Sequence, residues 1–458
     1  MTRDNAWNKY SQDNLNELER LCDDYRSFLD NGKTERECVN IAIDMAKEAG
    51  YLNLDDVIKS GKKVVAGDKI YSSFMGKSIV LFNIGNKPIE EGMNILGAHI
   101  DSPRLDVKQN PLYEEKELVY LDTHYYGGIK KYQWVTLPLA IHGVVVKTDG
   151  TVVNVVVGEE ENDPVVFISD LLVHLSQTQL EKKGSKVIEG EDLNIIIGNK
   201  PLKGEEKDAV KKNIIKLLEE KYGFCEEDFM SAELEIVPAG KAKNAGLDSS
   251  MIMAYGHDDR VCAYTSLVAM LKTENVNTTS CLLLVDKEEI GSVGATGMKS
   301  KFFENTLAEL LDRMGIYSEL TLRRTLANSM MLSSDVSAAY DPTYASVYEK
   351  KNAAYFSKGI VINKYTGSRG KSGSNDANAE YVAVVRNIFE KNDISYQTAE
   401  LGKVDQGGGG TIAYIMSLYG MNVIDSGVAV LNMHAPYEVV SKADVYEATK
   451  AYMAFIKE

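Results

Sequence analysis

The stretch CLLLVDKEEIG, residues 281–291, joins five apolar residues to a charged segment that holds two adjacent glutamates and ends in glycine. A short, continuously apolar run of this kind is typical of a strand buried in a sheet that is covered on both faces. Carboxylates at the end of a buried strand are costly to desolvate unless something, such as a divalent cation, compensates them. In an open α/β sheet, ligands bind outside the carboxyl ends of the strands. The stretch therefore predicts an α/β fold with a ligand site at one edge.

Metal-type ligands recur in the same position elsewhere in the chain. They occur in GAHID (97–101), GHDD (256–259), SSD (333–335) and NMHAP (432–436), each of which follows an apolar run. Zinc accepts nitrogen and oxygen ligands and keeps one position open for water when it is catalytic. Two histidines and three acids from five strand ends would give each of two cations one histidine, one terminal carboxylate and a share of a bridging carboxylate. The set predicts a two-metal hydrolytic centre.

Two of the motifs suggest how ligands are held. His99 and Asp101 are two residues apart on an expected strand, so their side chains share a face. A ligating imidazole usually donates its second N–H to a carboxylate, and this pair could supply one. On its own, however, the pattern fits a core histidine beside an exposed aspartate equally well. Asp258 and Asp259 precede an expected helix, and one of these carboxylates can bridge two cations. Acidic residues at a helix start also interact favourably with the positive end of the helix dipole. For this pair taken alone, the helix dipole is the simpler explanation.

The remaining motifs suggest a division of chemical roles. Glu288 and Glu289 are adjacent, so one side chain can bind a metal while the other faces the bound water as a general base. A solvated charge pair is the alternative, which the flanking glycines and the strand end make less favourable. Asp335 and His434 each follow an apolar run, and hydrogen-bonded polar groups at strand ends are the alternative for both.

Composition excludes several classes of protein. The chain has 458 residues and a formal net charge of −16, which argues against nucleic-acid binding because no basic stripe offsets the acidic excess. No run approaches the roughly 18 to 20 apolar residues that a membrane span needs, and residues 1–14 are polar, unlike a secretion signal. The five cysteines lie far apart without CxxC pairs, as expected for reduced thiols. We expect a cytoplasmic protein with no membrane partner.

Alternating strand and helix patterns predict a mixed central sheet with helices on both faces. Strands are expected at 78–83, 93–99, 144–146, 152–157, 281–286, 330–335 and 428–434. Helices are expected at 15–29, 34–50, 169–180, 208–222, 261–271, 300–311, 375–391, 411–418 and from Ser441, whose hydroxyl can cap the last helix. Residues 105–238 differ from the rest of the chain in their sequence pattern and contain none of the five ligand stretches. They predict a β-rich domain of 105–238 inserted into a discontinuous catalytic domain of 1–104 and 239–458.

Taken together, the segments GAHIDSPRLD, GHDDR, DKEEIGSVGATG, SSDVSAAYDP and NMHAPYEVVS resemble, in order and spacing, the aspartyl-aminopeptidase family of dizinc metallopeptidases, in its bacterial branch. The resemblance spans nearly the whole chain. It implies that two zinc ions divide the terminal ligands and share one bridging carboxylate, with one carboxylate orienting a histidine and one glutamate activating the bridging water. The implied terminal ligands are His99, Glu289, Asp335 and His434, and the implied bridging ligand is Asp258. By the same resemblance, Asp101 would orient His99 and Glu288 would be the general base.

The same resemblance carries expectations about assembly. Family members pack a zinc-peptidase-like catalytic domain with an inserted dimerisation domain, and their dimers form a hollow tetrahedral dodecamer. The segment DLLVHL (170–175) is similar to the family's insertion-domain segment whose histidine reaches a neighbouring subunit's active site, which implies a substrate-binding role for His174. Helical periodicity alone would make His174 an ordinary, partly buried residue.

Two segments depart from the family pattern. This chain has GHDDR where better-known members have RLDNL, and the segment that carries a substrate-binding lysine is matched poorly, so a preference for acidic N-terminal residues does not follow. Lys364, Arg369 and Lys371 could bind a substrate carboxylate, but a solvated basic loop explains them slightly better. Gly407–Gly410 lacks the lysine of a phosphate-binding loop and is better explained as a close-approach loop lining the substrate cleft.

The sequence therefore predicts a metalloaminopeptidase that hydrolyses the N-terminal residue of peptides with a zinc-activated water and a glutamate general base. Two divalent ions per subunit are expected, with zinc favoured over manganese or cobalt. A dizinc carboxypeptidase or a deacylase of small amides would use the same centre on another bond. A catalytically silent, shell-forming homologue is the alternative from another class, and the presence of all five ligands together with Glu288 counts against it.

Overall fold

The computed structural model describes residues 4–458, so residues 1–3 of the expected segment 1–104 lie outside the described part of the chain. The chain divides into two compact units by its internal contacts. The first comprises the chain through Asp101, Ala242–Met433 and Glu438–Glu458. The second comprises Ser102–Lys241 and His434–Tyr437. The second unit thus consists of one long insertion and one short segment from near the C-terminus.

A mixed sheet of nine strands, counted over residues 4–458, forms the centre of the first unit. In spatial order the strands are β1 (Leu52–Asn53), β2 (Lys69–Phe74), β3 (Ser78–Asn83), β13 (Ser280–Val285), β4 (Asn94–His99), β14 (Met330–Ser333), β18 (Asn422–Gly427), β16 (Ile360–Asn363) and β17 (Tyr396–Thr398). Strands β13, β4, β14 and β18 are mutually parallel, whereas β3 and β16 run antiparallel to their inner neighbours. The mixed α/β fold expected from the sequence is confirmed.

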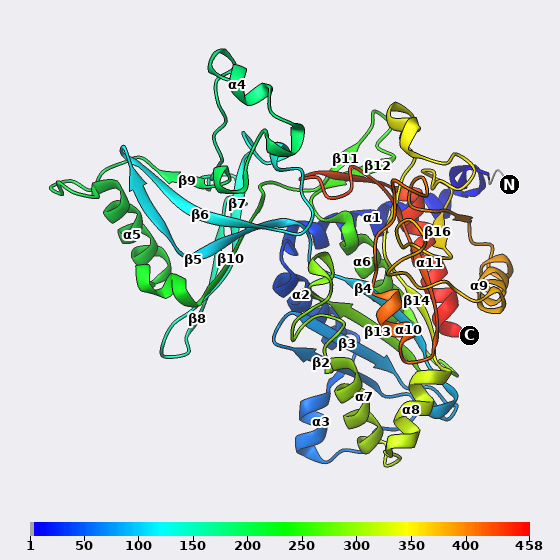
Figure 1. Ribbon diagram of the computed structural model, residues 1–458. Helices are drawn as coiled ribbons and strands as arrows, with labels where there is room; N and C mark the ends of the chain where they lie inside the picture. Colours follow the sequence, from blue (N-terminus) through cyan, green and yellow to red (C-terminus); the bar gives the residue numbers. More distant parts are fainter. Residues whose placement is uncertain (1–3) are drawn as a thin grey trace. The chain divides into compact units, whose positions relative to one another are not determined.

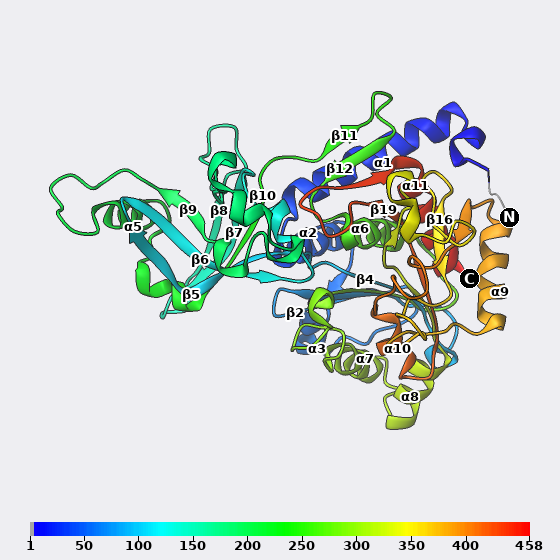
Figure 2. The same ribbon diagram turned by 45° about the horizontal axis from the view of Figure 1, so that its top comes forward.

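Helices cover both faces of this sheet (Figures 1 and 2). The first face packs against α2 (Glu35–Glu48), α6 (His257–Lys272), α9 (Ala379–Lys391) and α11 (Lys442–Lys457), and α1 (Gln12–Asn31) packs on α2, α6 and α11. The other packs against α3 (Leu54–Ser60), α7 (Phe302–Arg313), α8 (Glu319–Asn328) and α10 (Ala413–Ser417). Because successive side chains of a strand point to opposite faces, Leu282 and Leu284 join the first layer while Cys281 and Leu283 join the second. Both faces of β13 are therefore buried, as its unbroken apolar run predicts.

Local sequence signals account for the N-terminal helices. Ser11 and Thr34 are the N-caps of α1 and α2, and each takes part in a capping box with the residue three positions later, Asn14 and Glu37 respectively. Gly32 is the C-cap of α1. The apolar face of α1 then packs its leucines and aromatic residues into the core of the first unit.

A smaller sheet of five strands lies in the same unit. Its order is β11 (Lys243–Ala245), β12 (Met251–Ala254), β20 (Glu438–Ser441), β19 (Ala429–Leu431) and β15 (Ser337–Ala338). Strands β12 and β20 pair antiparallel, with Ala254 opposite Glu438. This pairing brings the segment that follows β12 next to the start of β20, although the two are far apart in sequence.

The second unit is built on a six-stranded antiparallel sheet. Its order is β8 (Val152–Val157), β7 (Leu139–Val146), β10 (Ala232–Pro238), β5 (Arg104–Glu115), β6 (Leu118–Tyr126) and β9 (Ile195–Gly198). The hairpin expected around residues 148–150 joins β7 to β8. Helices α4 (Gln177–Leu180) and α5 (Ala209–Tyr222) complete the unit.

Three local expectations were wrong. The strand expected at 428–434 is the shorter β19 (Ala429–Leu431), and His434 lies in a turn beyond it. Residues 169–180, expected to form one helix, contain a 3-10 turn at Val173–Leu175 and only the short helix α4. Their apolar side chains are largely exposed, so no core contact supports a longer helix there. The Ser441 hydroxyl does not cap α11; it forms a hydrogen bond with the Ser357 hydroxyl, at an Oγ–Oγ distance of 3.0 Å.

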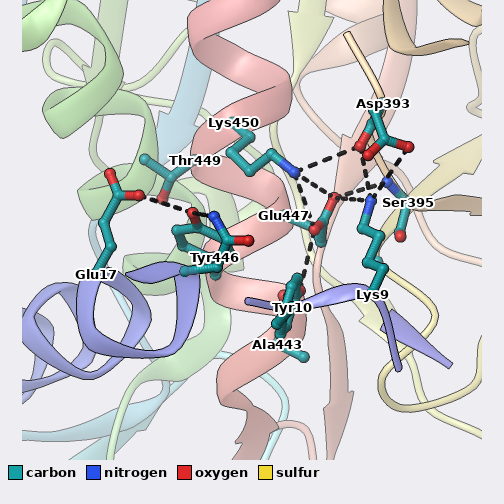
Figure 3. Close-up of polar contacts among 12 residues, drawn as sticks. Lys9, Tyr10, Glu17, Asp393, Ser395, Ala443, Tyr446, Glu447, Thr449 and Lys450 are labelled. Carbon is teal, nitrogen blue, oxygen red and sulfur yellow. Dashed lines mark hydrogen bonds and ion pairs between the residues drawn. The ribbon is translucent and has the colours of Figure 1, made fainter. Parts of the chain in front are cut away.

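The N-terminal segment is fastened to α11 by polar contacts around the buried carboxylate of Glu447 (Figure 3). Lys9 and Lys450 place their ammonium groups 3.4 Å and 3.2 Å from this carboxylate, and the Tyr10 hydroxyl donates to it at 3.0 Å. The backbone N–H of Ser395 donates to it at 2.6 Å. Cations and donors surround the buried charge, as its desolvation requires. Over residues 4–458, no helix combines the length and the apolar character of a membrane span.

Candidate metal centre

Three neighbouring parallel strands bring predicted site residues to one edge of the central sheet. His99 is the last residue of β4, Glu288 and Glu289 follow the end of β13, and Asp335 follows the end of β14. The register places Val285 opposite His99, and Ser333 opposite Gly97 on the other side of β4. The carboxyl ends of the three strands are therefore aligned, which is where ligands bind in such sheets.

The fourth ligand segment enters from the start of α6. Gly256 has φ of +78°, a left-handed conformation that favours glycine, and Asp258 and Asp259 have non-helical backbone angles. The N–H of Asp258 donates to Oε2 of Glu438 on β20 at 2.9 Å. Asp259 accepts the backbone N–H of His99 at 3.4 Å. The segment is therefore positioned by side-chain contacts rather than by helical hydrogen bonds.

The His99 imidazole lies at the centre of this group. Its Nε2 is 3.2 Å from Oδ1 of Asp258 and 3.9 Å from Oε2 of Glu288. Its Nδ1 is 2.9 Å from the backbone carbonyl oxygen of Asp101 and 3.3 Å from the Oδ1 of the same residue. Either oxygen of Asp101 can accept the Nδ1 proton, which leaves the Nε2 lone pair directed at the acidic group.

Asp101 also holds the two glutamates. Its Oδ1 accepts the backbone N–H of Glu288 at 3.1 Å, and its Oδ2 accepts that of Glu289 at 3.2 Å. One buried carboxylate therefore fixes the position of His99 and the backbone that carries Glu288 and Glu289. The orienting role expected for Asp101 fits this geometry and extends to two further residues.

The described residues contain three overlapping groups of donors that can hold a metal ion. They are His99 with Asp258 and Glu289, His99 with Glu288 and Asp335, and Asp258 with Asp259 and Asp335, and within each group the donor atoms lie within 4.8 Å of one another. Imidazole nitrogen and carboxylate oxygen are ligands that zinc accepts. The first two groups share His99, and Asp258 belongs to two of the three. Because a carboxylate has two oxygens, Asp258 could contribute a donor atom to each of two groups, whereas the His99 imidazole offers Nε2 alone.

The electrostatics of the site favour a cation. Burial raises the pKa of Asp335 well above its ordinary value, and the nearby Glu288 raises it further. Burial likewise raises the pKa of Asp259, with a further contribution from Asp335. Burial alone would lower the pKa of His99, but hydrogen bonds to Asp101 and Asp258 outweigh it and the net shift is upward. The carboxylates of this group stabilise positive charge at the position of Nε2, where a metal ion would serve as well as a proton.

His434 lies in the segment 434–437, which packs with the second unit. Its Nδ1 is 2.8 Å from the carbonyl oxygen of Gly128, and the Tyr437 hydroxyl donates to the carbonyl oxygen of Ala239 at 3.0 Å. If Nδ1 carries the proton, Nε2 has the lone pair that a metal ligand needs, as in many metal-ligating histidines. His434 has a φ of +64°, so its backbone is held in a conformation that few side-chain-bearing residues adopt.

The family model for aminopeptidase I zinc metalloproteases (M18) matches residues 28–456. This chain belongs to the M18 family. It is a zinc metalloaminopeptidase, and the aminopeptidase activity expected from its sequence is confirmed at the level of the family. A curated relative from Clostridium acetobutylicum, named "Probable M18 family aminopeptidase 1", is 63% identical over 453 residues, covering 99% of this chain and 97% of the relative.

Solved structures support the M18 assignment. The crystal structure of an M18 aminopeptidase from Thermotoga maritima is 43% identical, with a TM-score of 0.95, and the match covers 100% of this M18 chain and 99% of the other. A structure described as the S. cerevisiae mApe1 dodecamer is 21% identical, with a TM-score of 0.76 and 97% of each chain covered. At that identity, the second likeness establishes the fold alone.

His174 of this M18 aminopeptidase is exposed, rather than partly buried as helical periodicity predicts. It sits in the 3-10 turn Val173–Leu175 of the second unit. The apolar neighbours are exposed too, at 48% for Leu171, 58% for Leu172, 67% for Val173 and 69% for Leu175. A contiguous group of exposed apolar side chains is typical of an interaction surface.

Two lysines of the basic loop after β16 form ion pairs with one aspartate of the same loop. Lys364 and Lys371 form ion pairs with Asp376 at 3.4 Å and 2.8 Å, and Lys371 also lies over the Tyr365 ring, 3.9 Å from its centroid. The Asp376 carboxylate thus offsets one of the two lysine charges, and both lysine side chains are partly exposed to solvent. A role for them in binding a substrate carboxylate stays a prediction.

Gly407–Gly410 packs against another loop of the first unit. A Cβ on Gly408, whose φ is +103°, would lie 2.5 Å from the carbonyl oxygen of Gly367, and a Cβ on Gly407 would lie 1.6 Å from that of Leu401. The Gly409 N–H donates to the Thr366 carbonyl at 3.1 Å. The close approach expected from the glycines is thus an approach between two backbones.

Sequence reasoning missed three buried groups beside the centre. Glu438 is 1% exposed and accepts the Asp258 N–H, and Asp425 lies opposite Ser333, with its pKa raised by burial to about 6. His257, immediately before Asp258, is fully buried, and burial lowers its pKa to about 3. A glutamate within the apolar stretch EVVS was the available signal for Glu438. His257 gave none, because its hydrogen-bond partners are far away in sequence or on the backbone.

Proposed function

We propose that this M18 aminopeptidase binds two divalent cations per subunit at the carboxyl ends of β4, β13 and β14. In this proposal His99 and Glu289 bind one ion, Asp335 and His434 bind the other, and Asp258 bridges them. The observation that carries it is the overlap of the donor groups, in which His99 and Asp258 each belong to two groups whose donor atoms lie within 4.8 Å. Zinc is the favoured ion on these ligands, and manganese or cobalt can occupy the same nitrogen and oxygen donors.

Glu288 is proposed as the general base. Its side chain is 15% exposed and its Oε2 is 3.9 Å from Nε2 of His99, so it faces the donor group and remains accessible to water. Glu288 would accept a proton from the attacking water and pass it to the amine that leaves. Asp101 would keep Glu288 in place through the N–H that it accepts. When bound, the cations would lower the pKa of water and polarise the scissile carbonyl.

The free α-amine is the feature that separates an aminopeptidase from other two-metal amide hydrolases. Ala-, Asp- and Lys-p-nitroanilides and their N-acetylated counterparts are compared as substrates in the presence of zinc, manganese or cobalt. We expect the enzyme to cleave the substrates with a free amine and not the acetylated ones. The reason is that binding of the charged amine positions the first peptide bond for attack. The measurement is the steady-state rate of hydrolysis for each free-amine substrate and for its acetylated counterpart. Equal cleavage of the acetylated substrates would instead favour a deacylase or carboxypeptidase.

The second unit is proposed as the dimerisation domain, and a dodecamer built from dimers as the assembly. The exposed apolar group Leu171, Leu172, Val173 and Leu175 supports an interface there, because isolated monomers rarely keep such groups in water. A two-fold contact through this unit is the commonest symmetry of soluble oligomers. In a closed shell, access to the peptidase sites would be restricted. His174 would then contribute to a neighbouring subunit's site.

Replacing His174 tests the assembly and the cross-subunit role separately. We expect His174→Phe to form the same large oligomer as the wild type by light scattering, but to lose most of its peptidase activity. His124→Phe is a matched control, because His124 is also an exposed histidine of the second unit. A fully active wild-type monomer would contradict both parts. An intact and fully active His174→Phe oligomer would contradict only the cross-subunit role.

A cytoplasmic location is also proposed. Cys22, Cys38, Cys262 and Cys281 are free and buried, and Cys225 is free and exposed. Free thiols of this kind persist in a reducing compartment.

A further inference from the structure

His257 immediately precedes the proposed bridging residue, and both nitrogens of its ring are engaged. Its Nε2 lies 3.1 Å from the carbonyl oxygen of Ile252, which can only accept a hydrogen bond. Nε2 therefore carries the proton, and Nδ1 accepts the hydroxyl of Tyr25 at 2.7 Å. Both His257 and Tyr25 are 0% exposed. The imidazole is locked in one tautomer and one orientation.

Tyr25 reaches this position from α1, a helix that supplies none of the proposed metal ligands. The Tyr25 ring stacks on the ring of Tyr264 of α6 at a centroid distance of 5.3 Å, and the Phe28 ring contacts the Tyr264 ring at a centroid distance of 5.2 Å. The Arg260 guanidinium donates to the Lys33 carbonyl at 2.9 Å, just beyond the end of α1. Helix α1 and the turn that follows it thus contact His257 and Arg260, which lie on either side of Asp258 in the sequence.

This segment depends on such contacts because its backbone is irregular. Asp258 has φ −81° and ψ 106°, and Asp259 has φ −115° and ψ 26°, so neither residue is in a helical conformation. On one side the Asp258 N–H is held by Glu438, and on the other side His257 is held by Tyr25 and Ile252. A carboxylate that serves two cations must place both of its oxygens, so its backbone needs a fixed position.

We propose that His257 is a positioning residue for the bridging carboxylate, and that Tyr25 holds it in place. The hydroxyl of Tyr25 fixes the imidazole, and the imidazole fixes the backbone from which the Asp258 side chain extends toward Nε2 of His99. The inference rests on the proposed function, because it takes Asp258 as the bridge. It gives α1 a part in metal binding that the ligand residues alone do not suggest.

The variant Tyr25→Phe removes the hydroxyl and keeps the ring. We expect it to weaken zinc binding and to lower kcat by about 10- to 100-fold, the usual effect of losing a partner that orients a ligand, with KM near that of the wild type. Tyr51→Phe is a matched control. Tyr51 is also buried, and its hydroxyl donates to the Met270 carbonyl at the other end of α6, at 3.3 Å. Both variants lose one buried hydroxyl that forms a hydrogen bond to α6, so a purely structural role would affect them alike.

Zinc affinity by competition with a chelator, kcat, KM and thermal unfolding should be measured on both variants as oligomers. His257→Leu should resemble Tyr25→Phe or exceed it, and the double variant should be no worse than His257→Leu alone, because both changes break the same link. His257→Asn keeps an acceptor near the position of Nδ1 and should recover part of the affinity.

The result that overturns the inference is a Tyr25→Phe enzyme with wild-type zinc affinity and kcat, or one that differs from the wild type no more than Tyr51→Phe does. If His257→Leu fails to fold, the comparison of the two tyrosine variants still decides. A wild-type enzyme that is active without two bound ions would instead contradict the proposed function, and would do so before any variant is compared.

Discussion

Glu288→Gln is expected to lower kcat by about 10²- to 10⁴-fold, the range that a general base contributes, while both metal ions stay bound. Glutamine has the shape of glutamate, but its amide does not accept the proton of the attacking water. Because Glu288 is proposed not to bind metal, its loss removes no ligand. Steady-state kinetics and metal analysis on the same preparation check the two halves of this expectation.

Glu289→Gln is the matched control for this variant. The two glutamates are adjacent, and both donate their backbone N–H groups to Asp101, so the substitutions perturb the same loop. Glu289→Gln should release one ion of the pair, whereas Glu288→Gln should release none. The comparison is informative because each glutamate belongs to a donor group that can hold a metal. Loss of an ion from Glu288→Gln, with both ions kept by Glu289→Gln, would mean that the two roles are exchanged.

The positions of the proposed ligands at the strand ends could be predicted because the signal is local. An apolar run that ends in an acid or a histidine identifies both the strand and its polar end, as at His99 after β4 and Asp335 after β14. Parallel order then aligns the carboxyl ends, so five separate motifs predict one cluster. The capping box of α2 was predictable for the same reason, since four consecutive residues, from Thr34 to Glu37, contain the whole pattern.

Contacts between distant segments could not be predicted in this way. Tyr25 and His257 are separated by 232 positions, and nothing in the sequence around Tyr25 indicates a hydrogen bond to a buried imidazole. Ser441 has the right residue type for a helix cap, yet its hydroxyl contacts Ser357 of another segment. In each case tertiary packing decides between local options of similar free energy. The role of Glu438 follows only from the pairing of β20 with β12.

Asp258→Ala is expected to have the largest effect on metal binding. A bridging carboxylate contributes a ligand to both ions, and its removal also leaves the Nε2 of His99 without its 3.2 Å partner. We therefore expect both ions to bind far more weakly and peptidase activity to be lost. Asp335→Ala is the comparison, because a terminal ligand serves one ion and its removal should release one. Thermal unfolding of each variant, measured with added zinc and with a chelator, shows whether the protein remains folded.

The metal-to-subunit ratio of purified wild-type, Asp258→Ala and Asp335→Ala proteins, measured after dialysis against metal-free buffer, tests the two-metal centre most directly. The proposed ligand arrangement predicts two ions per subunit in the wild type, one in Asp335→Ala and none in Asp258→Ala. A folded Asp258→Ala protein that keeps one tightly bound ion, or an active wild type with a single ion, would contradict the bridging role of Asp258.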